Sequence, residues 1–242
     1  MTNELWFFIT VVVYLGSVLC LYKLLGKLGM YMFSIFGTLF GNVAACKCIN
    51  IFGFPTNAGV VIYAATFLVT DILSEKYGKK EAQKAVFSSL AAMLLWVIGT
   101  QFTLWAAPNA SDFVSSSMKN LFGFAPRIFV ASMTAYLCSQ TFDVFIYHFI
   151  WKKTGNNKTM LWLRNNGGTL LSQALDTVIF ITLGFWGSFP FKVFLSVVLT
   201  TYLFKALVAV LDTPFIYVAR KIKPLIEKQE GPESYAGAKV AA

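Results

Sequence analysis

Hydrophobic residues run through this chain in long stretches that charged residues interrupt only briefly. Four windows contain no charged residue at all, namely 5–22, 28–46, 48–70 and 85–111. A helix that crosses the hydrocarbon core of a bilayer needs ~20 mostly apolar residues. The pattern therefore predicts an all-α fold, that of a polytopic helical membrane protein.

The same pattern places seven spanning helices. Their expected bounds are 5–22, 30–52, 57–74, 86–107, 128–151, 168–188 and 192–218. Residues 5–22 look like a secretory signal, but no basic segment precedes them and no small-residue cleavage site follows, which favours a retained helix. If that segment is peripheral instead, six helices remain. Residues 1–223 are then one transmembrane domain, and 224–242, rich in Pro, Gly and small residues, are predicted to be a disordered cytoplasmic tail.

Positive charge alternates between successive connections. The connections 23–29, 75–85 and 152–167 and the C-terminal segment are basic, whereas 53–56 carries no charge. Basic loops stay on the cytoplasmic side of a membrane. The alternation predicts a multi-pass protein whose N-terminus lies outside and whose C-terminus is cytoplasmic.

Composition agrees with this class. The chain has 242 residues, of which 57% are hydrophobic and 13% charged, against roughly 25% charged in soluble domains. The net charge of +9 lies mostly in short loops, so no nucleic-acid partner is expected. The single histidine, His148, and four cysteines in apolar stretches form no metal-binding spacing. No cofactor, metal or enzymatic activity is predicted.

Four aspartates interrupt the predicted spans: Asp71, Asp143, Asp176 and Asp212. A carboxylate in a membrane helix costs ~2.5–3.5 kcal/mol and usually marks a substrate or ion site. Counted from the nearest basic boundary, all four lie roughly 8–18 Å from the inner edge of the membrane. Four helices thus place a carboxylate at comparable depth, which predicts one shared site.

Two of these aspartates belong to a repeated segment. Residues 139–144 read Ser-Gln-Thr-Phe-Asp-Val, and residues 172–177 read Ser-Gln-Ala-Leu-Asp-Thr. Gln and Asp three residues apart share a helix face, and the two helices run in opposite directions. This suggests an internal inverted repeat, with chance similarity as the alternative. Carboxylates accept hydrogen bonds, and amides both donate and accept them. The pairs Gln140–Asp143 and Gln173–Asp176 therefore suit a flat ligand with an amide-like edge, such as a purine.

Other polar positions have two interpretations each. Asp71, Ser74 and Glu75 share a helix face, either as a solvated helix end with Glu75 balanced by Lys79, or as a gate or ligand contact. Aromatic residues near the repeated segments could stack on a base or simply face lipid and core. They are Phe142, Phe180, Phe185 and Trp186.

Lys205 lies seven residues before Asp212 on one helix face. A buried ion pair between them is the simpler explanation, and contact of Lys205 with an acid from another helix is the alternative. Residues 164–168, which begin with Arg164, are expected to form a turn or a cytoplasmic gate. Asn42 is expected to join helices, and Asn57 to cap one.

Several of these segments together resemble a known family. They are Asn57-Ala58-Gly59, the run FLVTDILSEKYG at 67–78, the two repeated segments, and Trp162-x-Arg164-Asn165-Asn166. The chain resembles the queuosine precursor transporter family, once called vitamin uptake transporters, over roughly 30–215.

The resemblance implies import of a 7-deazaguanine base, such as 7-cyano-7-deazaguanine or queuine, across the inner (cell) membrane for tRNA modification. It implies that Gln140, Asp143, Gln173 and Asp176 bind this base. A gating or proton-linked role falls to Asp71, Glu75, Arg164, Lys205 and Asp212. The family is also likened to substrate-binding membrane subunits of energy-coupling transporters, so a subunit of an ATP-driven complex is an alternative, and a non-transporting scaffold is another. The oligomeric state stays open, a homodimer included.

Overall fold

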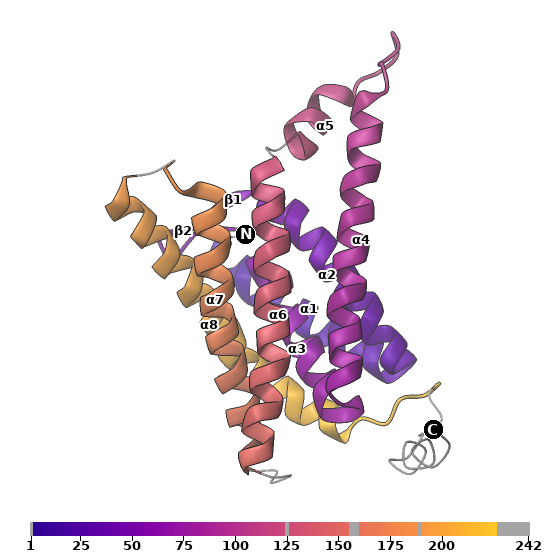
Figure 1. Ribbon diagram of the computed structural model, residues 1–242, viewed down its shortest axis with the longest axis vertical. Helices are drawn as coiled ribbons and strands as arrows, with labels where there is room; N and C mark the ends of the chain where they lie inside the picture. Colours follow the sequence, from indigo (N-terminus) through magenta and orange to yellow (C-terminus); the bar gives the residue numbers. More distant parts are fainter. Residues whose placement is uncertain (1, 124–125, 155–159, 188–189, 227–242) are drawn as a thin grey trace, which may run out of the picture.

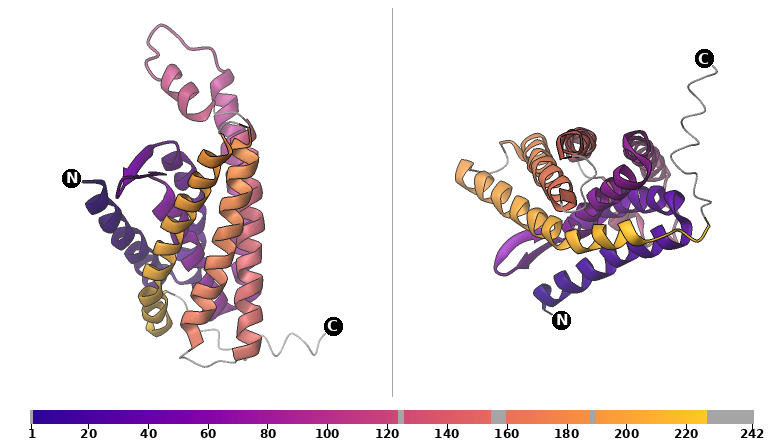
Figure 2. Two further views of the ribbon diagram at one scale, coloured as in Figure 1. Left: turned by 90° about the vertical axis from the view of Figure 1, so that its left-hand side faces the viewer. Right: turned by 90° about the horizontal axis from the view of Figure 1, so that it is seen from below.

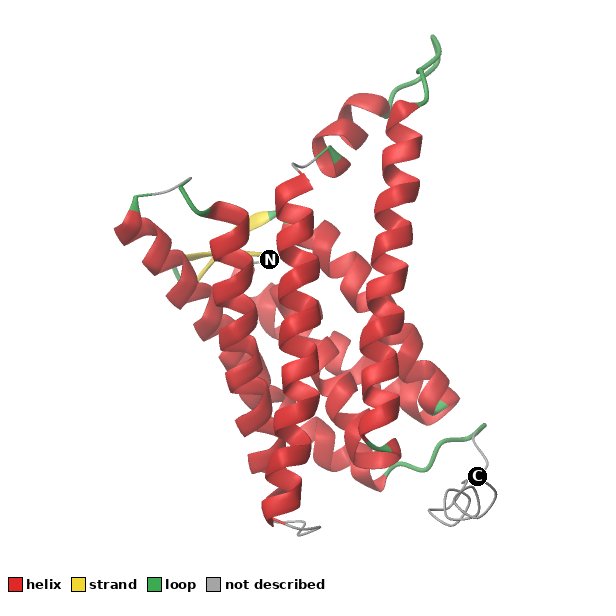
Figure 3. Ribbon diagram, in the orientation of Figure 1, coloured by secondary structure: helices red, strands yellow, loops and turns green. Residues whose placement is uncertain are grey.

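The computed structural model describes residues 2–123, 126–154, 160–187 and 190–226, and nearly all of them are helical (Figure 3). Eight helices and one two-stranded hairpin follow one another in this part of the chain. They are α1 (Asn3–Leu25), α2 (Lys27–Ala45), β1 (Cys48–Ile51), β2 (Phe54–Asn57), α3 (Val60–Tyr77), α4 (Lys79–Trp105), the short α5 (Ser115–Phe122), α6 (Pro126–Thr154), α7 (Leu161–Phe185) and α8 (Phe191–Lys221).

The architecture confirms the predicted class of protein. Five helices, α1, α2, α4, α7 and α8, are long and apolar enough to cross a membrane. The long helices α3 and α6 lie among them and contribute the buried charged residues Asp71 and Asp143. The protein is thus an all-α, polytopic membrane protein in which the polar groups are concentrated on particular helices.

The bundle has two distinct ends (Figure 1). At the hairpin end, which contains β1, β2 and α5, the side chain of Asn3 donates to the backbone oxygen of Asn50 at 2.8 Å. At the opposite end, which we call the basic end, the backbone N–H of Leu225 donates to the carbonyl of Lys23 at 2.8 Å. Helix α1 therefore runs from one end to the other. Its buried face packs into the common core, so residues 5–22 belong to the bundle. That face consists of Phe7, Val11, Leu15, Val18 and Tyr22.

The predicted second span is too long. Helix α2 stops at Ala45, and the chain then forms the antiparallel hairpin in which Ile51 pairs with Phe54. Phe52 and Gly53 both have positive φ, 51° and 78°, as a two-residue hairpin turn of the primed type requires. An apolar run alone does not distinguish a short strand from the end of a helix, which explains the error.

The predicted sixth span begins too late. Helix α7 starts at Leu161, so the turn expected at 164–168 is helical instead. Gly168 faces α6, and a Cβ there would make only an ordinary contact, 3.5 Å from Oδ1 of Asp143. The side chain of Arg164 lies outside the described residues. So does 227–242, which is most of the predicted tail.

Helix α3 lies in the interior of the bundle (Figure 2). It packs against α1, α2, α4, α6 and α8, and almost every side chain from Val60 to Ser74 is buried. A helix buried on all sides normally consists of apolar residues. Polar residues on α3 therefore face other helices across the core, and the candidate site is built around them.

Candidate functional site

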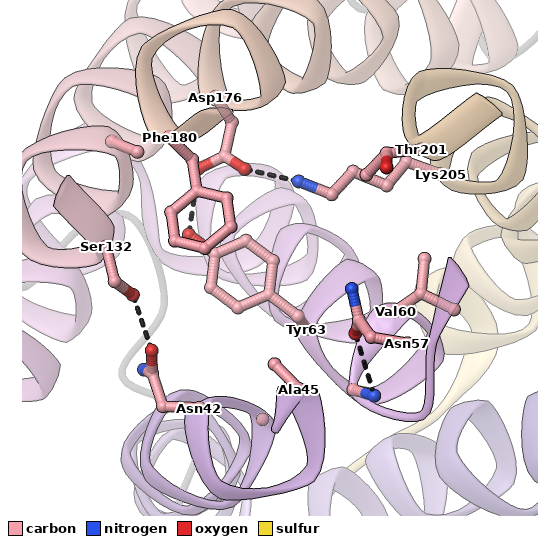
Figure 4. Close-up of a pocket in the computed structure, with 13 residues that line it drawn as sticks. Asn42, Ala45, Asn57, Val60, Tyr63, Ser132, Asp176, Phe180, Thr201 and Lys205 are labelled. Atoms are coloured by element: carbon pink, nitrogen blue, oxygen red, sulfur yellow. Dashed lines mark hydrogen bonds and ion pairs between the residues drawn. The ribbon is translucent and has the colours of Figure 1, made fainter. Parts of the chain in front are cut away.

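A pocket lies near the hairpin end, between α2, α3, α6, α7 and α8 (Figure 4). Its volume is about 50 Å³. Polar and aromatic side chains make up much of its wall, together with small residues of α2 and α3. The polar and aromatic ones are Asn42, Asn57, Tyr63, Ser132, Asp176, Phe180, Thr201 and Lys205.

Asp176 is the carboxylate of this pocket. It is 2% exposed and forms an ion pair with Lys205 through Oδ2. Its Oδ1 accepts from the hydroxyl of Tyr63 at 2.9 Å and from Ser139 at 3.0 Å. Three donors from three other helices thus converge on one carboxylate, which offsets much of the cost of burying its charge.

The ion pair expected between Lys205 and Asp212 is wrong. Seven residues span two turns of α8, about 10.5 Å along its axis, whereas α7 packs directly against α8 and places Asp176 opposite Lys205. The alternative, contact of Lys205 with an acid from another helix, is confirmed. The ammonium group also lies 5.1 Å from the centre of the Tyr63 ring, within cation–π range.

Two aromatic rings project into the pocket, Tyr63 from α3 and Phe180 from α7 (Figure 4). Of the four aromatic residues expected near a base, Phe180 is the one that lines it. Phe185 packs edge-on against Phe180 at 5.9 Å, Trp186 is 60% exposed, and Phe142 lines a different groove beside Lys79.

Asn42 has the structural role expected of it, whereas the cap expected at Asn57 is wrong, because the N-cap of α3 is Gly59 and has no side-chain cap bond. Both asparagines face the pocket. Asn42 joins α2 to α6 by accepting a 2.5 Å hydrogen bond from Ser132. Asn57 accepts from the backbone N–H of Gly59 at 3.0 Å, just before α3. Sequence reasoning missed Tyr63 and Ser132 as pocket residues. An isolated Tyr or Ser in an apolar helix carries no signal that separates it from packing residues.

The repeated segments interlock between α6 and α7. Ser139 of the first segment donates to Asp176 of the second at 3.0 Å, and Ser172 of the second donates to Asp143 of the first at 2.7 Å. The two serine–aspartate bonds are therefore reciprocal. This exchange gives the repeated pattern a physical meaning within this helix pair, and a larger inverted repeat stays a prediction.

The other expected base ligands lie deeper, one layer from the pocket toward the basic end. Gln140 donates to Thr66 at 2.9 Å and accepts from Thr70 at 3.2 Å. Thr70 is also 3.3 Å from Oδ2 of Asp143. Gln140 and Asp143 are both fully buried, and α3 hydroxyl groups connect them to each other.

Gln173 differs from these residues. It is fully buried, and neither its amide nitrogen nor its amide oxygen has a hydrogen-bond partner among the described residues. Leaving a buried polar group unpaired costs ~1–3 kcal/mol. The side chain of Gln173, one turn from Asp176, is thus free to bind a ligand.

Toward the basic end the buried polar groups continue. Asp71 and Ser74 are each 1% exposed, so the expected solvated helix end is wrong. The carboxylate of Glu75 accepts from Tyr147 at 2.7 Å and pairs with Arg220 at 3.3 Å, while Lys79 lies 5.4 Å from the Phe145 ring. Polar side chains of α3, α6, α7 and α8 thus form a column from the pocket to the basic end.

Comparison with known proteins now identifies the family. A family model described as "Putative vitamin uptake transporter" matches residues 57–219, which include all of the column except Arg220. The chain belongs to this family of transporters. The expected resemblance is confirmed, and the protein is a membrane transporter rather than an enzyme.

Curated relatives of this chain have a more specific name than the family model does. A "Probable queuosine precursor transporter" of Bacillus subtilis (strain 168) is 36% identical over 226 residues, which cover 93% of this chain and 98% of that protein. The "Queuosine precursor transporter" of Escherichia coli (strain K12) is 28% identical over 167 residues, covering 67% and 71%. No solved structure matches the chain, so the likeness to energy-coupling transporter subunits stays a prediction.

Proposed function

We propose that this transporter imports a queuosine precursor, a 7-deazaguanine base such as 7-cyano-7-deazaguanine, for tRNA modification. The names of its relatives support the substrate class. The observation that carries the proposal is a buried carboxylate, Asp176, held beside two aromatic rings in a pocket near one end of the bundle.

The chemistry of the pocket suits a guanine-type edge, which presents adjacent N–H donors and a carbonyl. Asp176 accepts from Lys205, Tyr63 and Ser139, and the N–H donors of a base would take over part of this role. Lys205, released from Asp176, would then donate to the carbonyl of the base. Tyr63 and Phe180 would stack on its flat faces, an interaction worth ~1–3 kcal/mol per base.

The pocket is narrow in this structure. Its volume of about 50 Å³ is well below the ~300–1,000 Å³ of most small-molecule sites. Entry of a base therefore requires the helices around Asp176 and Lys205 to separate. Gln173, buried without a partner, would join the site as it widens.

We assign the deeper residues to later steps of transport. Gln140 and Asp143 would contact the base as it moves along the polar column. Asp71 and Asp212 lie beyond them, and the Glu75–Arg220 pair would act as a gate at the basic end. Lys205 controls access to the pocket itself. Arg164 is assigned to the gate at the basic end from its position in the sequence alone. With the basic end cytoplasmic, as its charge predicts, the pocket receives the base from outside.

The test is ligand-dependent thermal stability of the purified protein. A ligand that binds the native state raises stability by about 2.7 kcal/mol at a hundredfold excess over its Kd. We expect 7-deazaguanine bases to raise the Tm and adenine to leave it unchanged. Asp176→Asn should abolish the shift, whereas Asp112→Asn, in an exposed loop where Asp112 caps α5, should retain it.

Uptake of radiolabelled precursor into a precursor-deficient cell is the companion experiment. Wild type and Asp112→Asn should accumulate label, and Asp176→Asn should not, at equal expression. Full uptake by Asp176→Asn would overturn the assigned site. Absence of any Tm shift or uptake in the wild type would overturn the proposed substrate.

A further inference from the structure

Three carboxyl groups from three helices meet between the pocket and the basic end. Asp71 on α3, Asp143 on α6 and Asp212 on α8 are each at most 1% exposed. All three carboxyl groups bond the same face of α7: Asp212 accepts from Asn165, Asp71 from Thr169 one turn later, and Asp143 from Ser172. We call these three residues the carboxyl cluster.

The contacts of the carboxyl cluster with other residues come from uncharged groups. Thr169 donates to Asp71 at 3.1 Å, and Asn165 donates to Asp212 at 2.7 Å. Asp143 accepts from the hydroxyl groups of Ser172 and Thr70, as described above. The cluster therefore has hydroxyl and amide donors but no ion pair with a described basic side chain.

Titratable groups on the surrounding helices make other contacts. Lys205 holds Asp176, Arg220 pairs with Glu75, and Lys76 donates to the backbone oxygen of Arg220 at 2.6 Å. The side chain of Arg164 on α7 lies outside the described residues. Other titratable groups on the neighbouring helices include Tyr22 on α1, Lys27 and Tyr31 on α2, Tyr63 and Tyr77 on α3, Lys79, Glu81 and Lys84 on α4, Tyr136, Tyr147 and His148 on α6, and Tyr202 and Tyr217 on α8.

Buried acceptors without donors provide a second, independent observation. Oδ2 of Asp212 and Oδ1 of Asn165 are both buried and have no hydrogen-bond partner in the described structure. The Asn165 side chain is aimed at the cluster, because its amide nitrogen bonds Asp212. Among the described residues the cluster is thus short of donors, and a proton on Asp212 would supply one.

Electrostatic repulsion also favours a proton bound within the carboxyl cluster. Carboxylates held close together in a dry interior disfavour one another's ionisation, and such pairs can share a proton. An unpaired buried carboxylate is far costlier still. Asparagine side chains would make similar hydrogen bonds without that cost, so a purely structural role does not account for three acids here.

We propose that Asp71, Asp143 and Asp212 form a proton-binding site whose loading and release couple import to the transmembrane proton gradient. The proposal rests on the proposed function, import from the hairpin end to the basic end. A proton enters from the outer aqueous phase with the base, neutralises a carboxylate of the cluster, and leaves to the cytoplasm when the basic end opens. Loss of that proton restores like-charge repulsion among α3, α6 and α8, which favours the open basic end.

A hydrogen-bonded route connects the two sites. Asp143 is linked through Thr70 and Gln140 to Thr66, one turn from Tyr63, which bonds Asp176 in the pocket. Movement of Asp176 on base binding therefore reaches the carboxyl cluster through α3 and α6. Helices α3 and α6 contribute residues to both the pocket and the carboxyl cluster, so movement of these two helices is enough to couple base binding to proton binding.

The first experiment tests for bound protons without any ligand. Infrared spectra of the purified full chain at neutral pH should contain the carbonyl-stretch band of protonated carboxylic acids, shifted in D₂O. Asp71→Asn, Asp143→Asn and Asp212→Asn should each lower its intensity, and Asp112→Asn should not. Absence of the band from the wild type would overturn the proton site, even if every variant failed to fold.

The second experiment tests coupling in proteoliposomes with 7-cyano-7-deazaguanine. A gradient of about one pH unit, acidic outside, is worth about tenfold accumulation per coupled proton. The wild type should accumulate the base, and a dye inside should report acidification with uptake. A protonophore should abolish accumulation, and Asp212→Asn should no longer concentrate the base.

The outcomes separate the two proposals. Uptake that equilibrates without responding to the pH gradient would overturn coupling and leave the proposed function standing. Accumulation driven by a sodium gradient instead would overturn the proton as the coupling ion. If the wild type neither binds nor transports the base, the proposed function fails and coupling fails with it, while the infrared band still decides the proton site.

Discussion

The ammonium group of Lys205 on α8 is paired with the carboxylate of Asp176 on α7, and both groups line the pocket. Side chains of both residues are nearly buried, at 7% and 3% exposed. Removing one partner of a buried pair leaves an uncompensated charge and costs ~3–5 kcal/mol. We therefore expect Lys205→Met to lower the Tm of the purified protein strongly.

The matched control is the double variant Lys205→Met/Asp176→Asn, which contains no unpaired charge. We expect its Tm to recover most of the loss, since replacing both partners of a buried pair is often nearly neutral. A double variant less stable than Lys205→Met alone would contradict this explanation and indicate that Asp176 is held mainly by Tyr63 and Ser139.

Sequence pattern sufficed for the membrane class, the seven long helices and the burial of the four aspartates, but the single shared site was wrong, because Asp176 lines the pocket and the other three do not. It did not predict the partner of Lys205. Spacing along one helix relates Lys205 to Asp212, but contact between helices depends on how α7 and α8 are aligned, which packing decides.

The pocket itself was only partly predictable for the same reason. Asp176 could be predicted from the sequence because a carboxylate in an apolar helix is easy to recognise. Tyr63 is one of 10 tyrosines and Phe180 one of 24 phenylalanines, and their chain positions do not distinguish a pocket wall from packing. The hairpin was missed because residues 48–52 are mostly apolar and were assigned to the end of the second span, and a short apolar run does not distinguish a strand from a helix end.

Stacking on Phe180 should contribute to base binding. Phe180→Ala removes a ring from the pocket wall, and loss of base–aromatic stacking costs ~1–3 kcal/mol. We expect the Kd for a 7-deazaguanine, measured by calorimetry or ligand-dependent Tm, to rise by about 5- to 150-fold.

Phe142→Ala is the control for this variant. Phe142 is also an aromatic residue, inside the first repeated segment, but it lines a separate groove beside Lys79. Its removal should leave the Kd within about twofold of the wild type. Equal weakening by both substitutions would indicate a general loss of packing and would remove Phe180 from the proposed site.

Gly59 should tolerate no side chain. A Cβ at this position would lie 2.4 Å from the carbonyl oxygen of Gly41 and 2.8 Å from the backbone nitrogen of Ala45. Both contacts are backbone atoms of α2 at the edge of the pocket, so relief requires α3 to move away from α2. We expect Gly59→Ala to destabilise the protein by ~1–3 kcal/mol, as overpacking does, and to weaken base binding.

The comparison for Gly59 is Gly99, on α4, where a Cβ would meet nothing within 4 Å. Gly99→Ala should change stability by less than ~1 kcal/mol, in the stabilising direction, and leave base binding unchanged. Thermal unfolding with and without 7-deazaguanine measures both effects. A neutral Gly59→Ala would mean that α2 and α3 are less tightly packed at the pocket than this arrangement requires.

Orientation in the membrane decides the direction of transport. Four separate segments on the side of the basic end contain lysines, which predicts that this end faces the cytoplasm, while the exposed loop before α5 lies at the hairpin end (Figure 1). With the four native cysteines replaced by alanine, Ser111→Cys should react with a membrane-impermeant maleimide on intact cells. Lys153→Cys, in the last turn of α6, should react only after permeabilisation. The reverse labelling pattern would place the pocket on the cytoplasmic side. The base would then enter the pocket from the cytoplasm before it reached the carboxyl cluster, as expected of an exporter.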